Sequence, residues 1–189
     1  MNLSKECKKK LIGLLYPVII DWADSYGHKR PPRSFLLNYD YDFIDVANYA
    51  AMYNGREILS VGTCYNDTKK IKVASARSKL SVMQTLVHEL IHVVQSFNYG
   101  RLYGYAYSEE SRKNSHETNK YECEARQAEE LFLDEWRHNK QLWQALFFFE
   151  YEYAESCPSY RAFEYYTPEI SYWNDPNIRV HYRSWWLRR

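Results

Sequence analysis

The feature that most constrains this chain is the stretch 80–97, whose side chains divide completely between the two faces of a helix. At 3.6 residues per turn, the polar residues fall on one arc and the apolar residues fill the rest. The polar arc contains no Lys or Arg, and Glu89 is its only carboxylate. A solvent-facing stripe ordinarily carries more charge. The pattern therefore predicts a helix embedded in a core, with a sheltered polar face.

This polar face contains a potential metal-binding motif, H-E-L-I-H at residues 88–92. Helix residues four apart lie on the same face, so His88 and His92 can bind one ion. Two neutral imidazoles suit Zn²⁺, and Glu89 beside them can act as general base on a water that the ion activates. Short motifs also recur by chance, and an ordinary amphipathic helix with two surface histidines is the alternative interpretation.

A zinc ion needs a third protein ligand and an open position for water. One known source is a third histidine, in the longer motif H-E-x-x-H-x-x-G-x-x-H. Here Gln95 stands in place of the glycine and Asn98 in place of the histidine. The third ligand is therefore expected to be a glutamate on a later helix.

The segment 121–132 has a helical pattern and offers four glutamates. Glu124 shares a face with small and apolar residues that should meet the core. Because a buried, unpaired carboxylate is costly, coordination to a metal would remove that cost. We therefore predict Glu124 as the third ligand, with Glu122 and Glu129 as alternatives. A salt bridge to a buried arginine is the alternative role for Glu124.

Two predicted strands precede the motif helix. Residues 57–65 and 70–75 flank the turn-forming segment 66–69 and predict a hairpin. The strand next to the helix could pair with an extended peptide through main-chain hydrogen bonds.

The rest of the chain predicts helices and short strands. The expected elements are a helix over 3–26 that stops at Gly27, a short strand over 35–38, a helical segment over 43–53, a polar loop over 98–116, a helix over 117–137 and an aromatic helical segment over 142–153. Together they predict an α+β fold, with a small antiparallel or mixed sheet packed on the motif helix and additional helices at both ends. A length of 189 residues suits one domain, 1–189.

The composition narrows the class of protein. With 25 basic and 24 acidic residues, the net charge of +1 gives no sign of a nucleic-acid partner. The apolar run 11–20 is too short to span a membrane, and no small-x-small cleavage site follows it, so we expect a helix of the mature protein. The sequence contains no C-x-x-C pair. We therefore expect the cysteines to be reduced thiols and the protein to be cytoplasmic. The cysteines are Cys7, Cys64, Cys123 and Cys157.

The motif, together with E-C-E-A at 122–125, resembles the small glutamate-zincin metallopeptidases of phages and bacteria, which include ImmA/IrrE-like and SprT-like relatives. The resemblance covers about 57–132. It implies a compact zincin core and a Zn²⁺-dependent peptidase acting on a peptide or protein, in the host cytoplasm if the chain is phage-encoded. It also implies His88, His92 and Glu124 as ligands and Glu89 as the catalytic residue. One departure is Ala128, where thermolysin-like enzymes have an aspartate that supports a ligand.

Two other points stay open at this stage. No sequence argument chooses the group that would stabilise the reacting carbonyl oxygen among Tyr99, Tyr103, Tyr105, Tyr107 and His116. The alternative function is a non-catalytic zinc protein with a structural or partner-binding role, such as a virion or host-interaction component. It is motivated by the aromatic C-terminal third, 142–189. A protease for DNA-linked proteins is a third possibility, suggested only by the basic and aromatic tail.

Overall fold

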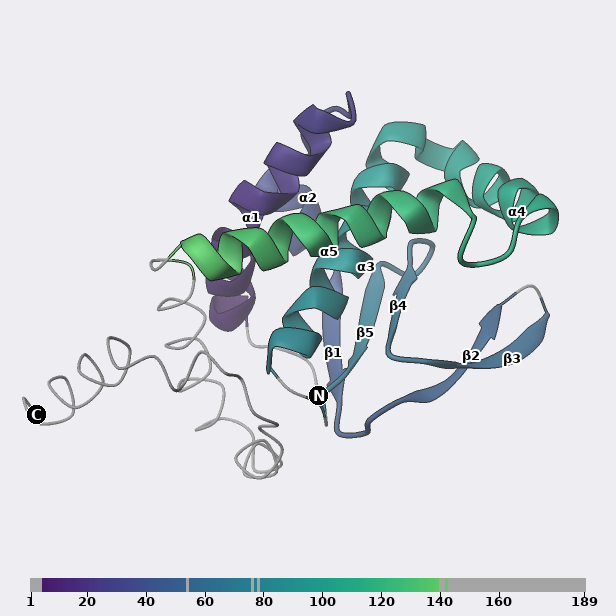
Figure 1. The fold of residues 1–189 in the computed structure, drawn as a ribbon, viewed down its shortest axis with the longest axis horizontal. Helices are drawn as coiled ribbons and strands as arrows, with labels where there is room; N and C mark the ends of the chain where they lie inside the picture. Colours follow the sequence, from purple (N-terminus) through teal and green to yellow (C-terminus); the bar gives the residue numbers. More distant parts are fainter. Residues whose placement is uncertain (1–4, 54, 76, 78, 140–141, 143–189) are drawn as a thin grey trace, which may run out of the picture.

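The computed structural model describes residues 5–53, 55–75, 77, 79–139 and 142, and it has an α+β fold (Figure 1). The predicted aromatic helix over 142–153 and the tail therefore lie, apart from Leu142, outside the described residues. The elements in order are α1 (Lys5–Ser25), α2 (Arg33–Leu37), β1 (Asp40–Ile44), β2 (Tyr49–Tyr53), β3 (Arg56–Ser60), β4 (Gly62–Tyr65), β5 (Lys70–Ala74), α3 (Lys79–Tyr99), the 3₁₀ turn η1 (Gly100–Leu102), α4 (Tyr103–Lys113) and α5 (Lys120–His138).

The N-terminal helix α1 confirms the prediction for 3–26. Leu11, Leu15 and Ile19, spaced four apart, form a fully buried stripe. The helix ends at Ser25, and the turn that follows contains Gly27, whose φ of +69° suits a residue without a side chain. The next amide, that of His28, donates to the carbonyl of Ala23 at 2.8 Å, which satisfies a carbonyl that the helix would otherwise leave unpaired.

The main sheet has three strands in the order β1-β5-β4, with β1 parallel and β4 antiparallel to β5. The predicted hairpin is confirmed as β4–β5, with Tyr65 opposite Lys70. The predicted strand over 57–65 is divided at Val61, and its first half, β3, pairs with β2 in a separate two-stranded sheet. Within the described residues, β4 is therefore an edge strand of the main sheet.

Three predicted elements were wrong. Residues 35–37 of the predicted strand 35–38 belong to α2, and Asn38 caps that helix. Most of the segment 43–53 is extended in β1 and β2 rather than helical. Residues 98–116, expected to be a loop, contain α4. In α4, Tyr103 and Tyr107 lie one turn apart and direct their hydroxyls to the same polar cluster. That spacing is a helical signal, which the neighbouring Gly100 and Gly104 obscured.

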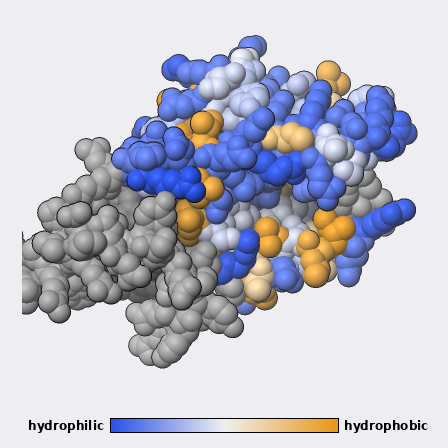
Figure 2. Space-filling model, viewed as in Figure 1, coloured by the Kyte–Doolittle hydropathy of each residue, from blue (hydrophilic) through white to orange (hydrophobic). Residues whose placement is uncertain are grey.

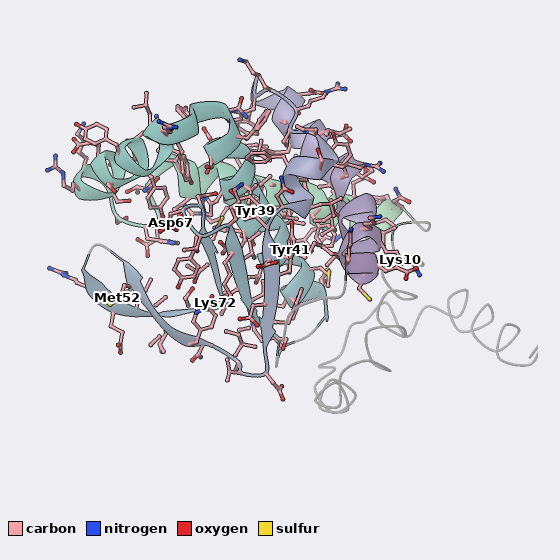
Figure 3. All side chains as sticks on the ribbon, turned by 180° about the vertical axis from the view of Figure 1, so that it is seen from behind. Lys10, Tyr39, Tyr41, Met52, Asp67 and Lys72 are labelled. Atoms are coloured by element: carbon pink, nitrogen blue, oxygen red, sulfur yellow. The ribbon has the colours of Figure 1, made fainter. Side chains whose placement is uncertain are left out.

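The motif helix α3 lies at the centre of the fold, as predicted for a helix embedded in a core. It packs against α5 on one side and against β4 and β5 on the other. Leu86, Leu90 and Val94 are fully buried on it, and Ala125 and Ala128 of α5 allow the two helices to approach closely. The core also takes in aromatic residues from around β1. Figure 3 shows Tyr39 and Tyr41 there, and Met52 on the β2–β3 hairpin.

The surface is mainly hydrophilic on the face drawn in Figure 2, and apolar groups show in several separate places, one of them toward the β2–β3 hairpin. There Met52 and Leu59 are exposed. Among the described residues, no helix combines the length and the apolar character that crossing a membrane requires. The described cysteines, Cys7, Cys64 and Cys123, form no disulfide with one another.

Candidate metal centre

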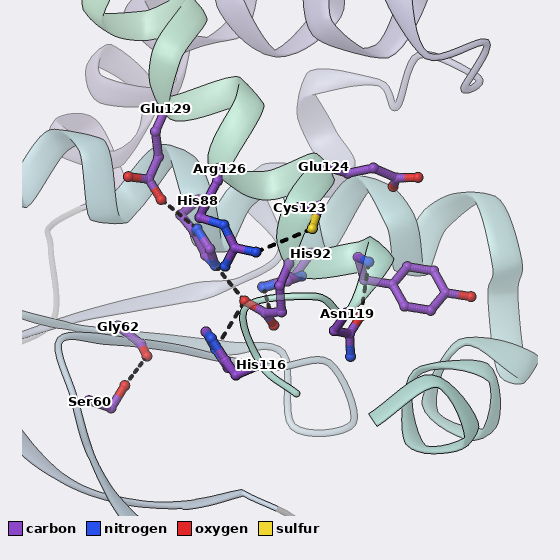
Figure 4. A network of polar contacts seen from close by, with 12 residues as sticks. Ser60, Gly62, His88, His92, His116, Asn119, Cys123, Glu124, Arg126 and Glu129 are labelled. Atoms are coloured by element: carbon purple, nitrogen blue, oxygen red, sulfur yellow. Dashed lines mark hydrogen bonds and ion pairs between the residues drawn. The ribbon is translucent and has the colours of Figure 1, made fainter. Parts of the chain in front are cut away.

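Two histidines of α3 and one glutamate of α5 meet in a group that could hold a metal ion. The ligand atoms of His88, His92 and Glu122 all lie within 4.8 Å of one another. The Nε2 of His88 is 3.1 Å from one carboxylate oxygen of Glu122, and the Nε2 of His92 is 3.3 Å from the other. Figure 4 shows His88 and His92 directed from α3 toward the start of α5.

The position of Glu122 is set by the cap of α5. Asn119 precedes the helix with extended backbone, and its side chain accepts a hydrogen bond from the amide of Tyr121 at 2.9 Å. The same side chain donates to the hydroxyl of Ser111 on α4 at 2.9 Å, and Asn119 is fully buried. The first turn of α5 is thus held in place from both sides, and Glu122 with it.

The structure does not place Glu124, the predicted third ligand, in this group; Glu122, one of the two alternatives, lies there. Glu124 instead accepts a hydrogen bond from Gln95 at 2.9 Å and lies 3.5 Å from the Nε2 of His28. The buried stripe of α5 runs through Tyr121, Ala125, Ala128 and Phe132. At about 100° per residue, Glu122 and Glu124 lie on opposite flanks of that stripe, and a helical wheel cannot tell which flank meets the histidines.

The other nitrogen of each imidazole also has an acceptor. The Nδ1 of His88 is 2.6 Å from Glu129 Oε1, and the Nδ1 of His92 is 2.9 Å from Gln95 Oε1. Such contacts fix the tautomer and ring orientation of metal-binding histidines and leave Nε2 for the ion. Glu129, predicted only as a reserve ligand, therefore supports His88.

The charges of the group are strongly coupled. Burial alone would raise the pKa of Glu122, but His92, His116 and His88 outweigh it and hold that pKa well below its usual range. Burial lowers the pKa of His88, but the carboxylates of Glu122 and Glu129 outweigh it and raise the pKa to about 10. Glu122, only 2% exposed, is thus an ionised carboxylate compensated by imidazoles. Two imidazole nitrogens and one carboxylate fit Zn²⁺, whose catalytic sites use such donors.

Glu89 is buried next to this group and against the edge of the sheet. Burial raises the pKa of its carboxyl, and the neighbouring His88 and His92 counteract part of that effect. The carboxylate lies against Gly62 of β4, where an added Cβ would be 2.5 Å from Glu89 Oε1 and 2.5 Å from the Thr85 methyl group. A glycine at this position therefore lets β4 approach the motif helix closely.

Replacing Gly62 with alanine is expected to displace the Glu89 side chain and to lower stability by about 1 to 3 kcal/mol, the usual cost of overpacking. Denaturant unfolding measures the stability. The matched control is Gly104→Ala, since Gly104 lies in α4 with no atom near its missing Cβ. That control should be neutral or slightly stabilising, because alanine favours a helix. Equal stability of the Gly62 variant and wild type would contradict the close approach.

Among the residues left open by the sequence, His116 and Tyr107 reach Glu122. The Nε2 of His116, on the segment between α4 and α5, is 3.1 Å from Glu122 Oε2, and the hydroxyl of Tyr107 donates to Glu122 Oε1. Tyr103 lies behind His92, with its hydroxyl 3.1 Å from Nδ1. Tyr105 is exposed, and Tyr99 packs on the ring of Tyr121.

Comparisons with protein-family models, with curated proteins and with solved structures found no match for this chain. The interpretation of the site consequently depends on its own geometry. That geometry defines an α+β protein in which His88, His92 and Glu122 form a possible metal-binding group.

Proposed function

We propose that this chain is a zinc-dependent peptidase, with His88, His92 and Glu122 as ligands and Glu89 as general base. The observation that carries the proposal is the convergence of both Nε2 atoms on one buried carboxylate, beside a second buried carboxyl that lies against an edge strand. A bound Zn²⁺ would polarise a substrate carbonyl and increase the acidity of a water.

The surrounding residues supply the remaining chemistry of peptide hydrolysis. Glu89 takes a proton from the attacking water and passes it to the leaving amine, a role favoured by its raised pKa. His116 and Tyr107 bring hydrogen-bond donors to the carboxylate of Glu122, so they are the nearest candidates to stabilise the reacting carbonyl oxygen. An extended polypeptide would pair with β4, the edge strand that lies against Glu89.

Metal removal tests the proposal. The purified chain is expected to contain about one zinc ion and to hydrolyse an unstructured protein such as labelled casein. A chelator should abolish hydrolysis and lower the melting temperature, and added zinc should restore both. At a thousandfold excess over Kd, bound zinc stabilises the folded state by about 4 kcal/mol. Elemental analysis, calorimetry and a fluorescence assay measure the three quantities.

Full hydrolysis by a preparation freed of zinc would contradict the proposal. So would a chain that takes up no zinc when folded in its presence. The control for the chelator is its zinc-saturated form, which should leave both the melting temperature and the hydrolysis unchanged.

The position of His116 favours one alternative, a zinc protein without catalytic activity. His116 is 47% exposed and lies 3.1 Å from Glu122 Oε2, so a small movement of its segment would make it a fourth ligand. Four protein ligands are typical of structural zinc sites, whereas catalytic sites keep one position open. The absorption spectrum of the Co²⁺ form reports the number of ligands and separates the two functions.

A further inference from the structure

Gln95, three residues after His92 on α3, is fully buried and has a partner for every polar group of its amide. Its oxygen lies 2.9 Å from the Nδ1 of His92 and accepts a hydrogen bond from the hydroxyl of Tyr103 at 3.1 Å. Its nitrogen donates to the carbonyl of Tyr121 at 3.0 Å and to the carboxylate of Glu124 at 2.9 Å. The amide thus connects His92 to the start of α5.

The partners of Gln95 permit only one orientation of its amide. The Tyr121 carbonyl and the Glu124 carboxylate are acceptors, so they must face the amide nitrogen. The amide oxygen then faces His92, and because this oxygen can only accept, the Nδ1 of His92 must carry the proton. When the ring is neutral, Nε2 is therefore the unprotonated nitrogen, and it faces Glu122 at 3.3 Å. This is the tautomer that a metal ion on that side requires.

From this geometry we propose that Glu124 is a positioning residue of the metal centre. It holds the Gln95 amide in the orientation that presents the Nε2 of His92 to the ion. Figure 4 shows Glu124 turned away from the histidines, so it does not act as a ligand. The Glu124 side chain is 22% exposed, and its carboxylate lies 3.5 Å from His28, just beyond the end of α1, which helps to place it. The inference builds on the metal site of the proposed function.

The first test compares the zinc affinity of variants of the full chain by competition with a chelating dye. Glu124→Met removes the acceptor and is expected to weaken binding about 3- to 10-fold, less than the 10- to 100-fold typical of a residue that touches a ligand. Glu124→Gln keeps an oxygen that can accept from Gln95, so it should stay within about twofold of wild type. Glu130→Met, at an exposed position of the same helix, should have no effect.

This set of variants separates hydrogen bonding from charge. Equal weakening by Glu124→Gln and Glu124→Met would show that only the negative charge matters, and would overturn the proposal. An unchanged affinity in Glu124→Met would overturn it as well.

A double-variant cycle tests whether Glu124 acts through Gln95. In the background of Gln95→Leu, which removes the amide, Glu124→Met should cause no further loss of zinc affinity. A second loss as large as that in the wild-type background would overturn the proposal.

A readout without metal distinguishes failure of this inference from failure of the proposed function. In the metal-free chain, at a pH where the ring is neutral, ¹⁵N spectra of His92 should show the proton on Nδ1 alone. Glu124→Met should shift these resonances toward a mixture of tautomers, while Glu130→Met should not. Unchanged ¹⁵N shifts in Glu124→Met would overturn the inference, whether or not the chain hydrolyses peptides.

Discussion

Replacing Glu122 with alanine is expected to abolish stoichiometric zinc binding. Glu122 supplies both carboxylate oxygens that the Nε2 atoms of His88 and His92 face, and the carboxylate is almost completely buried. Its removal leaves two imidazoles without the anionic ligand. The expected loss of affinity exceeds about 100-fold, the upper end for residues that only support a ligand. Competition with a chelating dye measures it.

The control for this variant is Glu124→Ala, because the sequence pattern alone favoured Glu124. That variant should keep measurable zinc binding, with the smaller loss expected for a positioning residue. A chain that loses zinc on Glu124→Ala and keeps it on Glu122→Ala would reverse the assignment. Far-ultraviolet circular dichroism of both variants shows whether the helix content of the chain is retained.

Replacing Glu89 with glutamine is expected to lower kcat about 10²- to 10⁴-fold while leaving zinc bound. The substitution keeps the shape of a buried side chain that lies against Gly62, but it removes the ability to accept a proton. General acid–base catalysis contributes rate factors of this size. Single-turnover hydrolysis of a labelled peptide measures the rate, and elemental analysis measures the zinc.

The zinc content separates loss of chemistry from loss of the site. If Glu89→Gln cleaves as fast as wild type with zinc bound, Glu89 is not the base and the peptidase proposal fails. If the variant also loses its zinc, the loss of activity says nothing about proton transfer. In that case Glu89→Asp, which keeps the carboxylate, provides the comparison.

The sequence predicted those parts of the fold where one side of an element is uniformly apolar. The helix α3 was predicted almost to the residue, because its polar and apolar side chains separate completely. The prediction of a helix over 43–53 was wrong. The alanines at helical spacing outweighed the alternating burial pattern of Tyr41 and Phe43 in the short strand β1. Strand pairing such as β1 with β5 is a long-range contact that no local pattern records.

The site was predictable only within single elements. The four-residue spacing of His88 and His92 is a local property and placed both on one face. The choice between Glu122 and Glu124 depends on how α5 is rotated against α3. On a helical wheel, Leu131 drew the expected buried stripe toward Glu124, yet Leu131 is exposed in the structure. The role of Gly62 could not be predicted either, because it depends on the contact between β4 and α3.

The position of Glu122 at the start of α5 has a consequence for how α3, α4 and α5 are held together. His88 and Glu122 are 34 positions apart, and the chain between them includes all of α4. A cation bound by both residues would link the two ends of that stretch through coordination bonds and would hold α3, α4 and α5 together while it is bound. Binding of the cation and folding of these three helices would then be coupled, so that each stabilises the other.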